Sequence, residues 1–258
     1  EVYKGSSGAL FGPDAIGGAV NFITDIDYEN KLTLSGFNFN NNSINGNFTQ
    51  ILDNDWHINV QGVANQSVTD SAIAKGVESD GSKNYQFNLN AIKWIYDDLK
   101  FKSTIYARNT KSDYDKSASA EESVTSDNSM YAFQLGFEQL NEDKFKNLIL
   151  HYHNYDRLYR EQGKIDTYYS ESITIKAESE KNLSEKISFG YGSEYKYDWG
   201  NFSTTTFTSQ TKGHVKNFGV FANLGYKIND NQKLSIHGRN DDHNQTGGSR
   251  TYKVNFSQ

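Results

Sequence analysis

Apolar and polar residues alternate along most of the chain after Lys31. In segment 186–199 and segment 214–228 apolar residues recur at most alternate positions, and the residues between them are mostly polar or glycine, with Phe221 as an exception. Segment 129–140 repeats the pattern, with aromatic side chains on one face and Gln134 and Glu138 on the other. A period of two predicts β-strands in which one face meets an apolar environment and the other meets water.

The pattern predicts twelve strands, separated by clusters of Asn, Asp, Gly and Ser that are typical of turns. Segment 85–96 changes phase near Lys93, which indicates a β-bulge. The only proline, Pro13, lies outside the region of strands. The expected strands lie near 31–40, 44–51, 56–64, 85–96, 99–109, 129–140, 145–155, 171–182, 186–199, 214–228, 232–240 and 250–258.

The connections between these strands are expected to alternate in length. Short turns are predicted at 52–55, 97–98, 141–144, 183–185 and 229–231. Long loops are predicted at about 65–84, 110–128, 156–170, 200–213 and 241–249. Short turns at one end and long loops at the other are typical of outer-membrane β-barrels, whereas a β-sandwich has no reason to sort its loops in this way.

Composition agrees with strands that are apolar on one side only. The 258 residues include 35% hydrophobic, 22% charged and 14% aromatic residues, with 17 Tyr and 16 Phe. Trp56, Trp94, Tyr96, Phe145 and Tyr226 lie near the predicted short turns, where they would form an interfacial girdle. A secreted β-sandwich or lectin shares much of this composition, so composition alone does not separate the two.

Several classes of protein are disfavoured by the sequence. No run of 18 apolar residues is present, so no membrane-spanning helix is expected. The absence of cysteine excludes a disulfide framework and a thiolate metal site. The net charge of -6 disfavours nucleic acid as a partner, because phosphate backbones are bound by clustered Lys and Arg.

The most informative segment is 5–24, which carries five glycines between Gly5 and Gly18. Glycine allows tight turns and close approach of the backbone to other chains. A strand-like run, Ala19–Ile23, follows directly. A phosphate-binding loop would require a preceding strand, a following helix and a Lys-Ser/Thr pair, and none of these is apparent in the sequence.

This segment resembles the end of the plug domain of TonB-dependent outer-membrane receptors, in which a Gly-x-x-Ser-x-Leu-Tyr-Gly-x-x-Ala-Ile-Gly-Gly-x-Ile-Asn-Ile-Ile-Thr pattern precedes the barrel. Phe11 stands for the usual Tyr, and Lys4 keeps the charge of a frequent Arg but lacks its bidentate fork. The residues that we expect to serve plug packing and gating are Gly5, Ser7, Leu10, Phe11, Gly12, Ala15, Ile16, Gly17, Gly18, Asn21 and Thr24.

The resemblance implies an all-β protein whose antiparallel transmembrane barrel, usually of 22 strands, is preceded by a plug. Residues 1–28 would be the end of the plug and residues 29–258 about half of the barrel, so the chain is expected to be a fragment that lacks a signal peptide. The implied protein is a monomer in the outer membrane of a Gram-negative bacterium, in contact with its lipid. It is no enzyme and has no cofactor; a TonB-type energising protein would bind a box outside this sequence.

Segment 156–170 is the best candidate for ligand binding. Its tyrosines and arginines offer stacking faces, hydrogen bonds and cation–π contacts, which suit an iron chelate or a corrinoid. An exposed loop with self-paired charges is the alternative. The candidate residues are Arg157, Tyr159, Arg160, Tyr168 and Tyr169.

Other chemistry is sparse. His151 and His153 fall on one strand face and could bind a metal, although the sequence shows no third ligand nearby. Asp241, Asp242 and His243 are predicted to form a solvated turn rather than a ligand site. The carboxylates of 110–128 do not have the spacing of a calcium loop. No residues form a catalytic arrangement.

The expected function is therefore active uptake of a scarce nutrient. A ferric siderophore is the first candidate cargo and cobalamin the second, with haem or a glycan also open. The alternatives are an outer-membrane porin or adhesin without a plug, and a secreted β-sandwich that binds carbohydrate.

Overall fold

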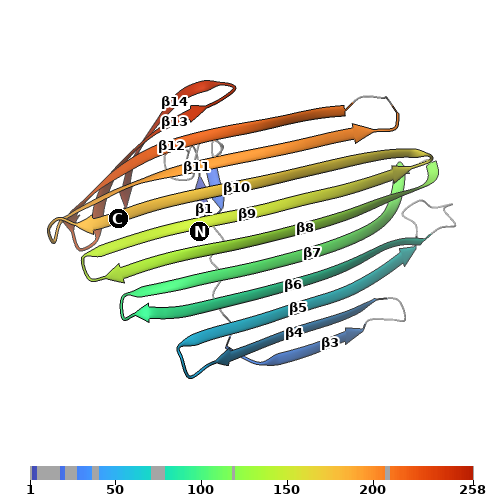
Figure 1. Ribbon diagram of the computed structural model, residues 1–258, viewed down its shortest axis with the longest axis horizontal. Coiled ribbons are helices and arrows are strands. Elements are labelled where there is room, and N and C mark those ends of the chain that lie inside the picture. The colour runs from blue at the N-terminus through green and yellow to red at the C-terminus, as the bar shows by residue number, and fades with distance from the viewer. Residues whose placement is uncertain are drawn as a thin grey trace.

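The computed structural model describes residues 2–4, 18–20, 28–36, 41–70, 79–117, 120–206 and 210–257. These residues form strands joined by turns (Figure 1). Within them, no helix has the length and hydropathy needed to cross a membrane. The strands are β1 (Val2–Lys4), β2 (Gly18–Val20), β3 (Lys31–Gly36), β4 (Asn42–Ile51), β5 (Trp56–Asp70), β6 (Ser79–Tyr96), β7 (Leu99–Ser117), β8 (Ala120–Asn141), β9 (Lys144–Glu161), β10 (Lys164–Asn182), β11 (Ile187–Thr204), β12 (Gln210–Asn229), β13 (Gln232–His243) and β14 (Gly247–Ser257).

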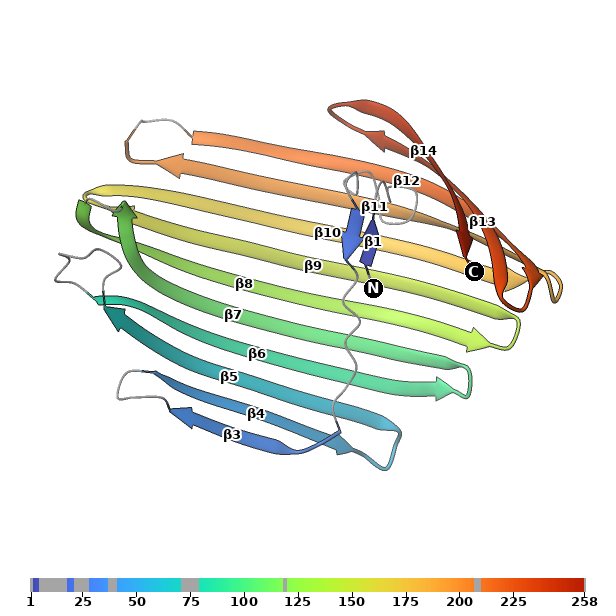
Figure 2. The same ribbon diagram turned by 180° about the vertical axis from the view of Figure 1, so that it is seen from behind.

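Strands β3 to β14 form one sheet of twelve strands in which each strand pairs with its neighbours in sequence. Every pairing is antiparallel, as a succession of hairpins requires. Strands β3 and β14 are the two edges, so the sheet is open (Figure 2). The twelve strands predicted from alternation are confirmed, and a register irregularity between Trp94 and Tyr96 confirms the predicted bulge.

The predicted long loops are mostly wrong. Strands β8, β10 and β12 contain 22, 19 and 20 residues, about twice what a bilayer crossing requires. They continue through most of the segments expected to be loops, and only residues 162–163 separate β9 from β10. We call the end of the sheet with the connections 71–78, 118–119, 162–163, 205–209 and 244–246 the distal end, and the opposite end the proximal end.

The two faces of the sheet differ sharply in polarity. Residues in register on neighbouring strands share a face, and one face carries Val60, Leu89, Ile105, Phe133 and Leu150 in successive strands. We call this the apolar face; its side chains include Phe87, Tyr131 and Leu224, exposed to 43%, 56% and 46%. The buried polar residues of the described chain all lie on the opposite, polar face: Asn59, Ser126, Asp166, Ser172, Asn217, His237, Arg239 and Asp241.

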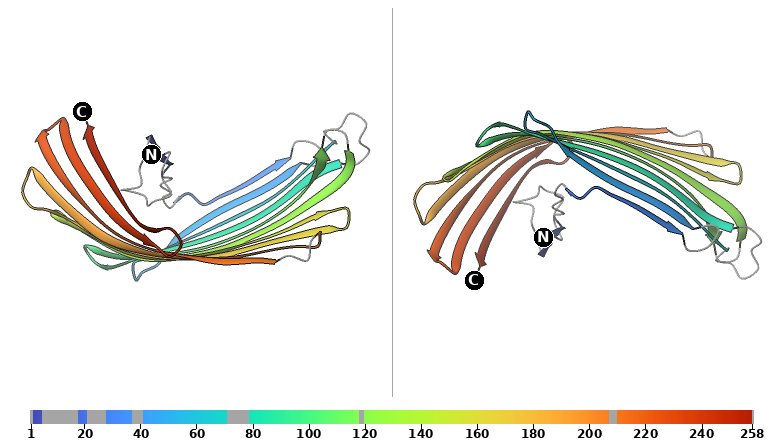
Figure 3. Two further views of the ribbon diagram at one scale, coloured as in Figure 1. Left: turned by 90° about the horizontal axis from the view of Figure 1, so that it is seen from above. Right: turned by 90° about the horizontal axis from the view of Figure 1, so that it is seen from below.

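The sheet is strongly curved, and Figure 3 shows the β1–β2 ribbon on its concave side. Side chains on a concave face are crowded together, whereas those on a convex face spread apart. The burial of the polar face and the exposure of the apolar face therefore assign the polar face to the concave side. The ribbon is held by pairing of Lys4 with Gly18 and of Val2 with Val20.

The expected proximal girdle is only partly present. Trp56 and Tyr226 fall on the apolar face, where Trp56 meets Phe101 edge to face and Lys93 lies over the indole. Trp94 and Phe145 fall on the polar face, where Trp94 pairs with Lys100 and Phe145 with Glu180. Proximity to a turn does not determine the face, since adjacent residues of a strand point to opposite sides.

Candidate functional site

Segment 156–170 forms the distal part of the β9–β10 hairpin instead of a loop. The hairpin turns at Gln162 and Gly163, whose φ angles are 31° and 77°. Positive φ at both central residues fits the twist of a two-residue hairpin. Because pairing continues to Glu161 and Lys164, the expected ligand residues are held on strands and their faces are defined.

Arg157, Tyr159 and Tyr168 lie together on the polar face. Arg157 pairs with Tyr168 across the hairpin, and its guanidinium lies 5.7 Å from the Tyr168 ring and 5.8 Å from the Tyr159 ring. Tyr168 stacks on Phe202 of β11 with ring centroids 4.7 Å apart. The arginine Nε is buried and has no hydrogen-bond partner among the described residues.

Arg160 and Tyr169 lie on the opposite, apolar face. Arg160 forms an ion pair with Asp127 of β8 at 2.9 Å. Tyr169 donates a hydrogen bond to Glu171, which raises the pKa of the phenol together with burial, and its ring meets Trp199 edge to face. The structure therefore separates the five expected ligand residues into two groups.

Residues from other strands complete the surface around Arg157. A groove of about 390 Å³ on the polar face is lined by Arg157 and Tyr155 of β9, Asn128 and Met130 of β8 and Arg108 of β7. The Arg108 Nε donates to Asn84 at 3.0 Å, and the Tyr155 hydroxyl donates to Asn128 at 2.7 Å. Sequence reasoning missed Arg108, since only the register of β7, β8 and β9 brings it near Arg157.

Asp166 adds a buried carboxylate to this end of the polar face, opposite Tyr159 in the register. Burial acts to raise its pKa, but hydrogen bonds from Thr204 and Lys164 and the positive charge of Lys164 outweigh burial, so the pKa lies below its usual value. Lys164 Nζ lies 3.1 Å from the carboxylate. Cationic and anionic groups thus lie side by side at the distal end of the polar face.

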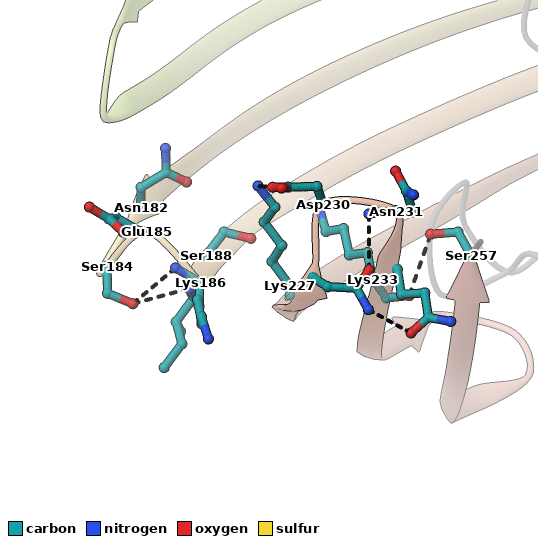
Figure 4. A pocket seen from close by; sticks show the side chains of 14 residues that line it. Asn182, Ser184, Glu185, Lys186, Ser188, Lys227, Asp230, Asn231, Lys233 and Ser257 are labelled. Carbon is teal, nitrogen blue, oxygen red and sulfur yellow. Dashed lines mark hydrogen bonds and ion pairs between the residues drawn. The ribbon is translucent and has the colours of Figure 1, made fainter.

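A second pocket, of about 330 Å³, lies at the proximal end between the β10–β11 and β12–β13 turns (Figure 4). Its polar groups mostly bind their own turns. Ser184 accepts hydrogen bonds from the backbone of Lys186 and Ile187, and Lys227 pairs with Asp230 at 2.7 Å. The hydrogen bond from Lys227 lowers the pKa of Asp230. These contacts stabilise turns, so the pocket is a weaker candidate for a ligand.

The residues 241–243 do not form the solvated turn that we expected. Asp241 is 1% exposed on β13 and binds Arg239, which is 3% exposed. The Arg239 Nε lies 2.9 Å from Asp241, and Nη2 lies 2.9 Å from Glu194 of β11. Asp242 faces the other side and pairs with Phe218 in the register.

Most of the expected plug residues lie outside the described residues: Gly5, Ser7, Leu10, Phe11, Gly12, Ala15, Ile16, Gly17, Asn21 and Thr24. Gly18 is described, as the first residue of β2. Among the described residues, no group of three or more His, Cys, Asp or Glu side chains could hold a metal ion.

Neither a family model nor a curated protein matches the sequence. Solved structures match it in fold. The siderophore receptor PirA from Acinetobacter baumannii has a TM-score of 0.76 at 16% identity, over 100% of this chain and 45% of its own. The copper transporter OprC has a TM-score of 0.74 at 12% identity, over 98% of this chain and 46% of its own.

The siderophore receptor PiuA from A. baumannii has a TM-score of 0.72 at 12% identity, over 99% of this chain and 50% of its own. The chain thus spans about half the length of these structures. At such identities the likeness establishes the fold, which is that of an outer-membrane receptor barrel in part.

Proposed function

We propose that this chain is part of a TonB-dependent outer-membrane receptor that takes up a ferric siderophore. Residues 1–28 would end the plug domain, and residues 29–258 would form about half of the barrel. The observation that carries the proposal is the twelve-stranded sheet with an apolar convex face, a polar concave face and a β1–β2 ribbon on the concave side. PirA and PiuA share the fold and are siderophore receptors, and this supports the cargo class.

The apolar convex face supports a membrane location. Exposed large apolar side chains occur on eleven of the twelve strands, β3, β4 and β6 to β14, and such a surface is far larger than soluble monomers tolerate. Lipid covers such a surface, and a closed barrel leaves no unpaired strand edge in the membrane. We therefore place the protein in the outer membrane of a Gram-negative bacterium, as a monomer surrounded by lipid.

A plug explains the polar concave face and the Gly-rich segment together. A wide barrel needs an obstruction, and glycine lets a plug backbone pass close to the wall. In this proposal Gly12, Gly17 and Gly18 serve tight packing, and Asn21 and Thr24 lie on the path to the first strand. A TonB-type protein would pull on a box outside this sequence.

The distal groove suits an anionic, partly aromatic cargo. Arg157 between two tyrosine rings offers charge and aromatic faces, and Arg108 adds a second cation across β8. Ferric chelates with carboxylate or phenolate oxygens would use both kinds of contact. Cobalamin is the second candidate, because tyrosine rings also suit a corrinoid.

Two other classes fit less well. A porin or adhesin barrel has no plug, so this class does not account for the β1–β2 ribbon or for the Gly-rich segment 5–24. A secreted β-sandwich buries its apolar faces between two sheets, whereas the described strands β3 to β14 belong to one sheet.

Growth and binding measurements test the proposal. A strain that lacks its own receptors would be supplied with the whole protein and with one ferric siderophore or cobalamin at a time. We expect growth on at least one ferric siderophore that depends on TonB. Growth on cobalamin alone would correct the cargo, and no TonB-dependent uptake of any cargo would overturn the proposal.

Arg157→Ala is the sharpest variant for the cargo site, and Arg160→Ala is its matched control three residues away on the opposite face. Arg157→Ala should weaken binding of the transported chelate by at least about tenfold, as expected for a charged hydrogen bond. Arg160→Ala should leave affinity within about twofold. Equal effects of the two variants would remove the groove from the binding site.

A further inference from the structure

His151 and His153 are not used by the proposed function, yet the structure places them as a pair. Both lie on the polar face of β9, in a half-buried position near the middle of the strand. Their ring centroids are 5.4 Å apart, with an angle of 37° between the ring planes. The neighbouring Tyr152 points to the other face, so nothing from β9 separates the two imidazoles.

This spacing fits two ligands of one metal ion. A metal–nitrogen bond of about 2.0–2.1 Å places each ring centroid about 3 Å from the metal, so tetrahedral ligands have centroids about 5 Å apart. The observed separation of 5.4 Å is close to this value. The backbone hydrogen bonds of β9 hold His151 and His153 on the same face, and this lowers the entropic cost of binding one metal ion with both side chains.

The adjacent strand β8 supplies further donors around the pair. His151 lies opposite Gln134 in the register, and His153 lies opposite Ala132. The small Ala132 side chain leaves room between its larger neighbours on the same face, Met130 and Gln134. A pocket of about 830 Å³ is lined by His151, Gln134, Ala132 and Met130 but not by His153. Met130 lies opposite Tyr155, two residues from Ala132 on the same face.

The donor types indicate which metal would bind. On β10, the residues opposite the two histidines are Thr174 and Ser172, so the immediate cross-strand neighbours on this face include no carboxylate. Calcium and magnesium require several oxygen ligands and are disfavoured. Imidazole binds copper strongly, and a thioether such as that of Met130 favours Cu(I).

We propose that His151 and His153 form a copper site on the polar face of the barrel wall, with the Met130 sulfur as a third donor. The site is formed by β8 and β9 alone. It does not rest on the proposed function, because binding by the wall is measured without any transport and without the siderophore.

Metal titration of the whole protein tests the site. The protein, purified in detergent after removal of its affinity tag, would be titrated with Cu²⁺ alone and followed by calorimetry and electron paramagnetic resonance. We expect the double variant His151→Asn/His153→Asn to bind one Cu²⁺ fewer and to lose a nitrogen-coordinated copper signal. His214→Asn, a lone exposed histidine on the apolar face, is the matched control and should change neither.

Met130→Leu separates the third donor from the imidazoles. This variant should weaken Cu⁺ binding at least about tenfold, measured by competition with a chromophoric Cu⁺ chelator, while Cu²⁺ binding changes less. Gel mobility before and after heating would establish that each variant is folded. If the folded double variant binds as many Cu²⁺ ions as the parent with equal affinity, the proposal is wrong.

Discussion

At the scale of single residues, the buried side chains of Arg239, Asp241 and Asn217 form a cluster with the half-buried Glu194. Asp241 accepts hydrogen bonds from Arg239 and, at 2.9 Å, from the Asn217 amide. A buried ion pair is costly to break, because the remaining charge loses its partner without regaining water. The cluster therefore joins strands β11, β12 and β13 by charge as well as by the backbone ladder.

Arg239→Ala should lower the free energy of unfolding by about 3–5 kcal/mol, since it leaves Asp241 buried and unpaired. Urea unfolding of the protein in vesicles, followed by tryptophan fluorescence, measures this loss. Arg250→Ala is the control, because Arg250 is an exposed arginine of the neighbouring strand. Equal stabilities of the two variants would show that the cluster contributes nothing beyond an exposed arginine.

Gly192 offers a second prediction at this scale. An added Cβ would lie 2.6 Å from the backbone oxygen of Ala177 and would also overlap the Phe221 ring. The strand cannot move away from a backbone atom of its own ladder partner without weakening pairing. Gly192→Ala should therefore cost about 1–3 kcal/mol of stability.

The same unfolding measurement on Gly62→Ala provides the comparison, because an added Cβ at Gly62 meets nothing within 4 Å. That variant should be neutral or slightly stabilising, since alanine loses less backbone entropy than glycine. A stability loss of the same size at both positions would contradict the steric argument.

At the scale of elements, the alternation of apolar and polar residues was sufficient to predict every strand of the large sheet. It did not predict the distal boundaries of these strands. In a membrane barrel, one face of each strand must be apolar within the bilayer, so the period of two is visible there. Beyond it both faces meet water, and Ser, Thr and Asn occupy both faces of strands that remain paired. The pattern disappears while the ladder continues, and segment 156–170 consequently resembles a loop.

The same loss of pattern explains what could be predicted of the candidate site. Residue type alone identified Arg157, Tyr159 and Tyr168 as candidate ligand residues. In a loop, however, Arg160 and Tyr169 would be equally good candidates. Only the strand register divides the two groups. Arg108 could not be linked to Arg157 from the sequence, because their proximity depends on pairing across β8.

Hydrogen exchange distinguishes the two interpretations of the distal segments. Amides of 155–161 and 164–170 should exchange slowly, because they are bonded within the β9–β10 ladder. Mass spectrometry of peptides from the folded protein measures the protection, with the unfolded protein as the reference. Exchange as fast as in the unfolded chain would restore the loop interpretation.

At the scale of the whole molecule, the face of a residue determines the effect of a charge. Leu135 and Gln134 are adjacent on β8, and Leu135 lies on the apolar face while Gln134 lies on the polar face opposite His151. In a membrane barrel, Leu135→Lys would place an ammonium in lipid. This should cost about 2–4 kcal/mol if Leu135 lies near the bilayer midplane.

Gln134→Lys should cost little by comparison, since its side chain reaches the hydrated interior. Folding of both variants into lipid vesicles, followed by gel mobility with and without heating, compares them directly. If the convex face met water instead, Gln134→Lys would be the more destabilising variant. Leu135→Lys would then place a lysine on an exposed surface, whereas Gln134→Lys would place one on the more buried concave face. The sign of the difference between two adjacent positions therefore decides which side of the sheet meets the membrane.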